Sequence, residues 1–475
     1  MDMKLYEKVK AYVCEHEEEI VADLFRLVRI PSVKSRAEEG APFGKECRRA
    51  LDDSVALFRE NGFEASVKSN GMYGIATYGE GEGDIGIFGH TDVVGVGDDW
   101  VFTKPFEPVR IGNTLVGRGV EDNKAGVIGG LYAIKALRDL NIPLRHRIVV
   151  FLGAEEESGM KDAAAFAENE KMPVISFVPD NDYPLCVGEK TIYNGWLRAQ
   201  NAFTSIRGVE GGFAYNVILD DVRITLEKTA TRKSELLSLI GDNAAYTLTE
   251  QEDVLVFAAH GVTAHASVPE RANNAARLAF ALLAKMESLP EADRAICASA
   301  EKIVAGYNGE GIGIAVSDSV FGKLTAANGM VDLREGKLGI SMDIRYGVRH
   351  DDEALFAALR DTCAALGFEE QGGKLSKGCL VHPDSEIVQA LVGVYREISG
   401  NESAKPYLSG GGTYARKLEN AFSIGTAVPW KPVDLALPAG HGGAHQSDEV
   451  ISLPGLLEAI ALNVMMLVEG DSFAD

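Results

Sequence analysis

The fold class is indicated most directly by residues 123–152, which read NKAGVIGGLYAIKALRDLNIPLRHRIVVFL. The first part, Asn123–Leu140, is predicted to be a helix, and the apolar run Ile148–Leu152 a buried strand. Strand-like runs also precede this segment, at Ile75–Tyr78 and Ile85–Phe88, with Gly-rich turns between them. Alternating buried strands and helices are typical of α/β folds, so we expect a mixed, mostly parallel sheet with flanking helices.

The pattern changes twice along the 475 residues. After about Gly188 the chain consists of strand–helix units without long apolar strands, such as Leu338–Ile344 followed by a helix at Asp352–Leu366. Near Pro383 the first pattern returns and continues into a C-terminal apolar segment. We therefore predict a discontinuous first domain, residues 1–187 and 383–475, into which a smaller α+β domain, residues 188–382, is inserted.

The chain is strongly acidic, because 70 Asp and Glu residues against 47 Lys and Arg residues give a formal net charge of -23. This balance argues against a nucleic acid or an anionic membrane as a partner. Six scattered cysteines without a C-x-x-C pair suit a reducing compartment. Residues 1–19 lack the apolar run of a signal peptide, and Leu453–Leu467 is shorter than a bilayer span. We therefore expect a cytoplasmic protein with a buried C-terminal helix.

A histidine and an aspartate directly follow the predicted strand Ile85–Phe88, in the sequence Phe88-Gly89-His90-Thr91-Asp92. Open α/β sheets bind ligands at the carboxyl ends of their strands, so both side chains are expected to face that crevice. A His with a carboxylate two residues on can be a metal ligand and its orienting partner. Alone, however, the pattern is more often a structural histidine.

Two acidic motifs follow along the chain. Asp122 lies in a Gly-rich turn entering a helix, where it or Asn123 could be the N-cap, or Asp122 could bridge two cations. Glu155, Glu156 and Glu157 come directly after a buried strand, where like charges repel unless a cation or proton compensates them. One Glu could bind a metal ion while its neighbour acts as a general base. The residues alone do not fix which Glu takes which role.

Two further motifs complete the set of five. Asp180 lies in the acidic stretch Val178–Asp182, and a Gly-rich loop near the C-terminus contains His441, His445, Asp448 and Glu449. Together the motifs supply His, Asp and Glu side chains but no Cys. Such nitrogen- and oxygen-rich sets suit catalytic Zn²⁺, Mn²⁺ or Co²⁺ rather than structural zinc.

Two Gly-rich segments could suggest a nucleotide-dependent oxidoreductase, but neither fits. Gly81–Gly86 matches G-x-G-x-x-G, yet it leads into a strand instead of following one and opening a helix. Gly410–Thr413 lacks the Gly-Lys-Ser/Thr ending of a phosphate loop. We interpret both segments as turns or loops that do not bind a nucleotide.

In their order along the chain, the five motifs, together with Ile30-Pro31-Ser32-Val33, resemble the M20 family of dinuclear metallopeptidases. They resemble most closely its bacterial dipeptidase branch, the PepV-like and Sapep-like enzymes, over nearly the whole chain. The resemblance implies a zinc-exopeptidase-like catalytic domain with two divalent ions, Zn²⁺ first and Mn²⁺ or Co²⁺ as alternatives. The ligands it implies are His90 and Asp180 for one ion, Glu157 and His445 for the other, and Asp122 as the bridge.

The resemblance also implies catalytic and substrate-binding roles. Asp92 would orient His90, and the family's Glu-Glu-Ser-Gly pattern makes Glu156 the general base. His265 in Ala264-His265-Ala266-Ser267 looks like the lid histidine that stabilises the oxyanion, although without the resemblance it would be a turn histidine. The residues that look like substrate-binding residues are Asn216 and Arg345 of the lid, and Gly411, Gly412 and Thr413 of a Gly-rich loop. Arg345, otherwise a surface residue at a strand end, would bind the substrate carboxylate.

The inserted segment is long for this family. In the dipeptidase branch a long lid resembles a doubled ferredoxin-like lid with two subdomains, which stands in for a partner subunit and implies a monomer. The function we expect is hydrolysis of unblocked dipeptides by a metal-activated water and a Glu base. The alternatives are an N-acyl-amino-acid amidohydrolase, which only the long lid disfavours, and a non-catalytic metal- or peptide-binding relative, which the intact Glu156 disfavours.

Overall fold

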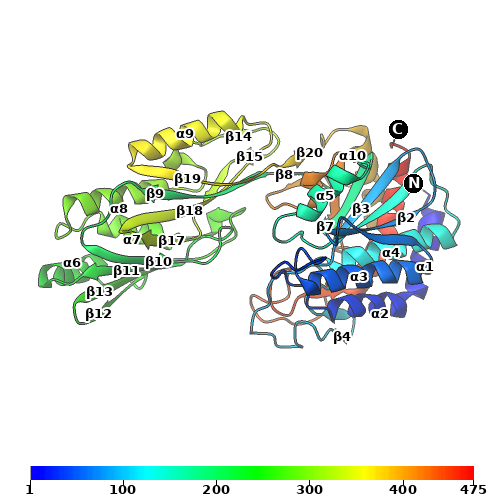
Figure 1. Ribbon diagram of the computed structural model, residues 1–475, viewed down its shortest axis with the longest axis horizontal. Helices are drawn as coiled ribbons and strands as arrows, with labels where there is room; N and C mark the ends of the chain where they lie inside the picture. The colour runs from blue at the N-terminus through cyan, green and yellow to red at the C-terminus, as the bar shows by residue number, and fades with distance from the viewer. Residues whose placement is uncertain (1, 475) are drawn as a thin grey trace. The chain divides into compact units, whose positions relative to one another are not determined.

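The computed structural model describes residues 2–474, which divide into two compact units. The first comprises the chain up to Glu189 and from Cys379 onward, and the second comprises Lys190–Gly378. Figure 1 labels most of their helices and strands. The chain leaves the first unit two residues later, and re-enters it four residues earlier, than the sequence pattern placed these points. The reason is that β8 (Cys186–Glu189) and β20 (Cys379–Leu380) pair with each other within the sheet of the first unit.

The first unit is built on a nine-stranded mixed sheet with the order β1-β2-β6-β3-β7-β22-β8-β20, and β21 also pairs with β8. Its further strands are β1 (Glu64–Lys68), β2 (Tyr73–Tyr78), β3 (Asp84–His90), β6 (Arg147–Gly153), β7 (Ile175–Asn181), β21 (Tyr407–Ser409) and β22 (Ala421–Gly425). The central strands β6, β3, β7 and β22 are parallel to one another. This confirms the predicted α/β class, and the nearly continuous apolar runs of β3 and β6 reflect burial on both faces.

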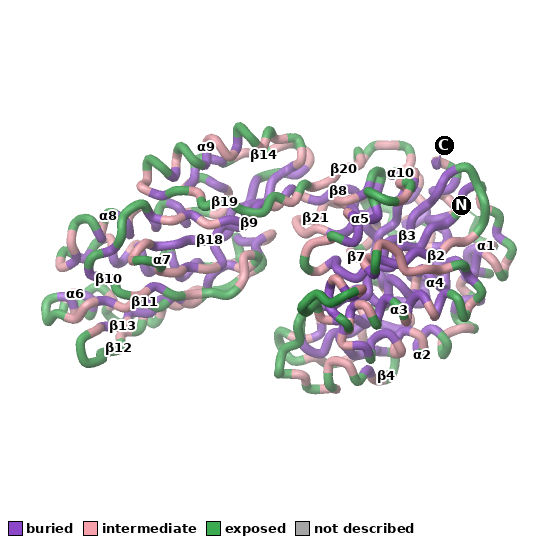
Figure 2. Tube along the Cα trace, in the orientation of Figure 1, coloured by how far each residue is buried: buried purple, intermediate pink, exposed green. Residues whose placement is uncertain are grey.

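Helices cover both faces of this sheet. They are α1 (Met3–Glu15), α2 (Glu17–Val28), α3 (Lys45–Glu60), α4 (Lys124–Asp139), α5 (Lys161–Asn169), α10 (Glu386–Ser399) and α11 (Leu453–Asp471). Side chains alternate along β6, so Val150 belongs to the large core formed with α1–α4, α10 and α11, whereas Phe151 belongs to a smaller core with α5 and the 3-10 helix η3 (Tyr414–Lys417). Both cores appear as buried segments in Figure 2.

The C-terminal helix α11 is a core helix, as predicted. It is long and apolar enough to cross a membrane, but 78% of its most apolar window is buried inside the protein. It packs against α1, α4 and α10. Directly before it, β23 (Val450–Ser452) pairs with β5 (Thr114–Val116), which also pairs with β4 (Val109–Ile111). This small sheet brings the C-terminal loop beside the turn that precedes α4.

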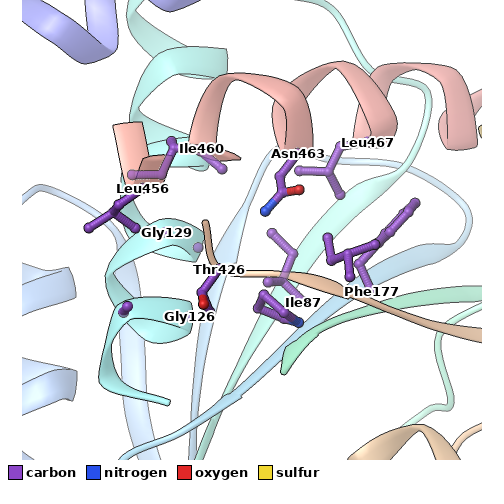
Figure 3. Close-up of a pocket in the computed structure, with 14 residues that line it drawn as sticks. Ile87, Gly126, Gly129, Phe177, Thr426, Leu456, Ile460, Asn463 and Leu467 are labelled. Atoms are coloured by element: carbon purple, nitrogen blue, oxygen red, sulfur yellow. The ribbon is translucent and has the colours of Figure 1, made fainter. Parts of the chain in front are cut away.

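An apolar cavity lies between α4 and α11, over β3, β7 and β22 (Figure 3). Gly126 and Gly129 contribute no side chain from α4, and the polar groups of the wall come from Thr426 and Asn463. At Gly129 an added Cβ would meet only Ile460, at an ordinary contact distance of 3.8 Å. The cavity can therefore accept a methyl group from this side of α4.

Gly129→Ala should stabilise the protein. Alanine is favoured over glycine in a helix interior by about 1 kcal/mol, which corresponds to a rise in Tm of about 2–4 °C in a domain of this order of size. Thermal unfolding of Gly129→Ala and Gly126→Ala provides the measurement. Gly126→Ala should be destabilising, because its Cβ would lie 2.4 Å from the Asn123 amide oxygen. A Tm for Gly129→Ala at or below that of the wild type would contradict the prediction.

The second unit contains one nine-stranded antiparallel sheet with the order β12-β13-β11-β10-β17-β18-β9-β19, and β16 pairs with β18. Its strands are β9 (Thr191–Ala199), β10 (Ile206–Gly211), β11 (Asp221–Glu227), β12 (Tyr246–Glu250), β13 (Val254–His260), β16 (Thr325–Ala327), β17 (Val331–Arg334), β18 (Lys337–Tyr346) and β19 (Phe368–Ser376), beside a small hairpin of β14 (Ser317–Asp318) and β15 (Gly322–Lys323). Its helices are α6 (Ala230–Ile240), α7 (Ala275–Leu283), α8 (Glu291–Ile303) and α9 (Asp352–Ala365), with 3-10 turns η1 (Pro269–Arg271) and η2 (Glu310–Ile312). The main hydrophobic core joins the sheet to α6, α7, α8 and α9, and a small second cluster contains Ile218, Ala266 and Ala327.

Candidate metal centre

The five predicted ligands converge at the carboxyl edge of the central strands of the first unit. His90 ends β3, Asp180 is the penultimate residue of β7, and Glu157 follows β6, so three ligands come from neighbouring parallel strands. Asp122 precedes α4, and His445 comes from the loop before β23. This edge is where open α/β sheets bind their ligands.

The side chains form two groups that could each hold an ion. One consists of His90, Asp122 and Asp180, and the other of Asp122, Glu157 and His445; in each, the ligand atoms lie within 4.8 Å of one another. Asp122 belongs to both. Its Oδ1 lies 3.2 Å from His90 Nε2, and its Oδ2 lies 3.1 Å from His445 Nε2. One carboxylate therefore presents a different oxygen to each group, as a bridging ligand would.

The remaining contacts show that the ligand atoms converge, but that some of them have no hydrogen-bond partner. His445 Nε2 is 3.1 Å from Glu157 Oε2, and His90 Nε2 is 3.7 Å from Asp180 Oδ2. His90 Nε2 and Glu157 Oε1 are nevertheless buried without a hydrogen bond of proper geometry. Buried polar atoms normally have partners. Each group thus contains a ligand atom, imidazole nitrogen or carboxylate oxygen, that lacks a hydrogen-bond partner. Such atoms fit a divalent cation such as Zn²⁺ or Mn²⁺.

The electrostatics of the cluster lead to the same interpretation. Burial and the neighbouring Asp122 raise the pKa of Asp180 to about 7. Burial, followed by Asp180, raises the pKa of Glu156 well above its usual value. Hydrogen bonds from the His445 ring to the carboxylates of Asp122 and Glu157 raise the pKa of His445 to about 10. Carboxylates crowded in a buried site repel one another, and bound cations would relieve that repulsion.

Asp92 holds its neighbours in two ways. His90 Nδ1 lies 2.9 Å from the main-chain carbonyl of Asp92 and 3.4 Å from its carboxylate, which directs Nε2 towards the other ligands. The Asp92 carboxylate instead accepts hydrogen bonds from the main-chain N–H groups of Glu156 and Glu157, at 3.1 and 3.2 Å. The predicted orienting contact is thus made chiefly by the carbonyl, while the carboxylate fixes the Glu turn.

The three consecutive glutamates have different surroundings. Glu155 is fully buried, forms an ion pair with Lys34, and accepts a hydrogen bond from the Lys161 N–H at 2.8 Å. Glu157 belongs to the second ligand group. Glu156 is 8% exposed, and its Oε1 is buried without a partner. The ambiguity left by the sequence is therefore reduced to Glu156 and Glu157, because Glu155 is engaged elsewhere.

Three buried residues support this centre in ways that the sequence did not predict. Asn123 occupies the N-cap position of α4 but makes no cap; its Nδ2 donates to Asp180 Oδ1 at 3.0 Å. Glu449 accepts a hydrogen bond from Arg118 at 2.7 Å and others from the main-chain N–H groups of residues 119, 121 and 122. The hydrogen bonds of Glu449 thus link the C-terminal loop to the turn that carries Asp122. They bring the predicted ligands Asp122 and His445 together. Asn123 and Glu449 lay in the quoted motifs, but sequence alone does not distinguish a buried polar side chain from a solvated one.

The Gly-rich loop, residues 409–413, also lies in the first unit. Thr413 donates hydrogen bonds from its N–H and its hydroxyl to the buried Glu189, at 2.9 and 2.7 Å. Arg416 donates to the other Glu189 oxygen at 3.1 Å and to the Gly411 carbonyl at 3.0 Å. An added Cβ at Gly412 would lie 1.7 Å from the Arg416 guanidinium, so a side chain here would displace that group from Glu189.

The other predicted substrate residues belong to the second unit. Within it, Asn216 and His265 are brought together, because the Ala266 N–H donates to the Asn216 carbonyl at 2.9 Å. The ring of His265 lies 2.6 Å from the Ser267 hydroxyl. Arg345 lies on β18 and is only 3% exposed, which is unlike a surface residue. Its guanidinium donates to both oxygens of Asp343, at 2.7 and 3.0 Å.

Comparison with known proteins supports one family for the whole chain. A model of the Peptidase family M20/M25/M40 matches residues 86–469. "Putative dipeptidase YtjP" of Bacillus subtilis is 29% identical over 96% of this chain and 98% of its own length. A protein of Staphylococcus aureus, also named as a putative dipeptidase, is 30% identical over 95% of this chain and 97% of its own.

Solved structures have the same fold at lower identity. The di-peptidase Dug1p of Saccharomyces cerevisiae has a TM-score of 0.56 and 12% identity, over 98% of each chain. Human carnosine dipeptidase 1 has a TM-score of 0.53 and 15% identity, over 98% of this chain and all of that one. The likeness to both extends across the two units.

Proposed function

Because the chain belongs to Peptidase family M20/M25/M40, we propose that it hydrolyses unblocked dipeptides at a centre of two divalent metal ions. The observation that carries the proposal is Asp122, whose two oxygens face two separate His–carboxylate groups. The names of the full-length relatives support a dipeptide as the substrate. Within the same proposal the preferred ion is Zn²⁺, and Mn²⁺ or Co²⁺ are the alternatives.

The chain's own residues supply the rest of the mechanism. Bound to the two groups, divalent cations would lower the pKa of water and polarise the scissile carbonyl. Glu156, with its buried and unpartnered Oε1, takes the proton from the attacking water and returns it to the leaving amine. Asp92 keeps this carboxylate in place through the turn that carries it.

The proposal also assigns substrate contacts to individual residues. His265 donates a hydrogen bond to the developing oxyanion, and Arg345 binds the substrate carboxylate through charge-assisted hydrogen bonds. Asn216 and residues 411–413 bind the substrate backbone. We also propose that the enzyme is a monomer, since its inserted unit is the long type of lid; sedimentation velocity tests that state.

Hydrolysis of a free dipeptide and of its N-acetylated form, after chelation and after restoring Zn²⁺ or Mn²⁺, tests the proposed function. We expect metal-dependent cleavage of the free dipeptide alone, because a dipeptidase requires the free amine. A preference for the acetylated form would instead show an N-acyl-amino-acid amidohydrolase. If neither form were cleaved with any of these ions, the dipeptidase proposal would fail and a binding function would remain.

A further inference from the structure

The turn that carries Glu156 is held by two buried carboxylates. Four successive main-chain N–H groups point at them. Those of Ala154 and Glu155 donate to Asp162 Oδ2, at 2.7 and 2.8 Å. Those of the next two residues donate to Asp92, as described above. Asp162 is fully buried, so the turn is fixed from two sides by groups that lie away from solvent.

Tyr414 contacts Asp162, the first of these two carboxylates. Its hydroxyl donates to the same Asp162 oxygen that accepts the two main-chain bonds. The side chain is fully buried, and its ring packs edge-on against His90, with 6.2 Å between the ring centroids. The fit is close, because a Cβ on Gly153 would lie 2.0 Å from the Tyr414 hydroxyl oxygen. Tyr414 thus contacts both the residue that holds the Glu turn and a proposed ligand.

Because of its position in the chain, Tyr414 also connects this turn to the Gly-rich loop. Tyr414 directly follows Thr413 of the Gly-rich loop, whose N–H and hydroxyl are held by Glu189. The loop proposed to bind substrate and the turn carrying the base are therefore joined by one buried hydroxyl–carboxylate contact. A purely structural role would explain the burial. It would not explain why the contact ends on the amides beside Glu156, whose Oε1 is buried without a partner.

We propose that Tyr414 and Asp162 are positioning residues that set the place of the Glu156 carboxylate for proton transfer. The inference rests on the proposed dipeptidase function. Without the hydroxyl, Asp162 loses one of its donors and the turn can shift. Small displacements of a reacting group are costly, since a misplacement of about 1 Å can lower a rate by about 10²-fold.

The test is a double-mutant cycle of Tyr414→Phe and Glu156→Gln, measured as kcat and KM on a free dipeptide. Tyr414→Phe alone should lower kcat by about 10–100-fold with little change in KM or in bound metal, because the effect is on positioning. In the Glu156→Gln background it should have no further effect, because a residue that acts only through Glu156 has nothing left to position. Asp162→Asn provides a second variant with the same expected pattern.

Tyr132→Phe is the matched control. Tyr132 is also fully buried in the first unit, and its hydroxyl donates to a carboxylate, that of Asp23, at 2.9 Å. Tyr132→Phe should lower the stability of the protein as Tyr414→Phe does, but it should leave kcat unchanged. An equal loss of kcat in both Tyr variants, or an undiminished effect of Tyr414→Phe in the Glu156→Gln background, would overturn the proposal.

Amide hydrogen exchange separates this inference from the proposed function. In the substrate-free protein, Tyr414→Phe should speed exchange at Ala154 and Glu155, and Tyr132→Phe should not. If Tyr414→Phe sped exchange at Ala154 and Glu155 but the protein cleaved no dipeptide, the positioning role of Tyr414 and Asp162 would be supported and the proposed function would fail. Unchanged exchange would overturn the inference whatever the activity.

Discussion

Glu156→Gln should lower kcat by about 10²–10⁴-fold, the usual range for loss of a general base, while both metal ions remain bound. Gln keeps the shape of the side chain but cannot take a proton. The substitution breaks no hydrogen bond of Oε1, because that oxygen is buried without a partner. Steady-state kinetics together with elemental analysis of bound metal are the measurements.

The same variant should be more stable than the wild type when metal is absent. Burial and Asp180 raise the pKa of Glu156, so the folded protein disfavours its charged form. The wild type therefore loses stability as the pH rises from about 4, the unfolded pKa of Glu, towards the raised folded value. The stability difference between the variants should accordingly appear at neutral pH and vanish below about pH 4. Stability gained with activity lost is a common signature of an active-site residue.

Glu168→Gln provides the control, because Glu168 is an exposed glutamate on the nearby helix α5. It should change neither kcat nor the stability of the metal-free protein measurably. Retention of wild-type kcat by Glu156→Gln would assign the base to another group, and Glu157 would then be the nearest carboxylate to test.

Asp122→Ala should abolish binding of both metal ions, and with them all activity. Each ligand group loses a member, because the two oxygens of Asp122 face different groups. His445→Ala removes a ligand from one group only, so it should leave one ion bound. We expect two ions per chain in the wild type, none in Asp122→Ala and one in His445→Ala. Elemental analysis after dialysis measures these numbers.

Thermal unfolding supplies a second measurement of the same prediction. A ligand at 100 times its Kd stabilises a folded protein by about 2.7 kcal/mol, so Zn²⁺ should raise the Tm of the wild type and not that of Asp122→Ala. Asp182→Ala is the control, because Asp182 is an exposed neighbour of Asp180 that belongs to neither group. Two ions retained by Asp122→Ala would show that this carboxylate does not bridge.

The sequence predicted the parts of the fold that repeat a simple physical pattern. The strands β3 and β6 are continuous apolar runs because they are buried on both faces, and α4 and α11 pack in the same core. Helix α3 was not predicted because it is polar on average, although its apolar residues fall on one side. The short strands β4, β5 and β23 were missed because three residues give no period to detect.

The candidate site divides in a similar way. His90, Asp122 and the Glu run were conspicuous because acidic residues and histidine directly follow or precede buried elements. His265 could be singled out only through the family resemblance, since a histidine in a turn has no distinctive pattern. Tyr414 and Asp162 form their contact 252 positions apart in the chain. Such buried polar contacts depend on tertiary packing, and a single sequence carries no local signal for them.

The discontinuity of the first unit has a consequence for how the protein is made. On the ribosome, Lys190–Gly378 emerges as one uninterrupted stretch that contains its own hydrophobic core, whereas the first unit needs residues from both sides of that stretch. Strand β22, which lies between β7 and β8, and helix α11, which packs in the core, are synthesised after the second unit. His445 emerges with them. The sheet of the first unit therefore stays unfinished, and the proposed metal centre stays incomplete, until the whole inserted unit has been made.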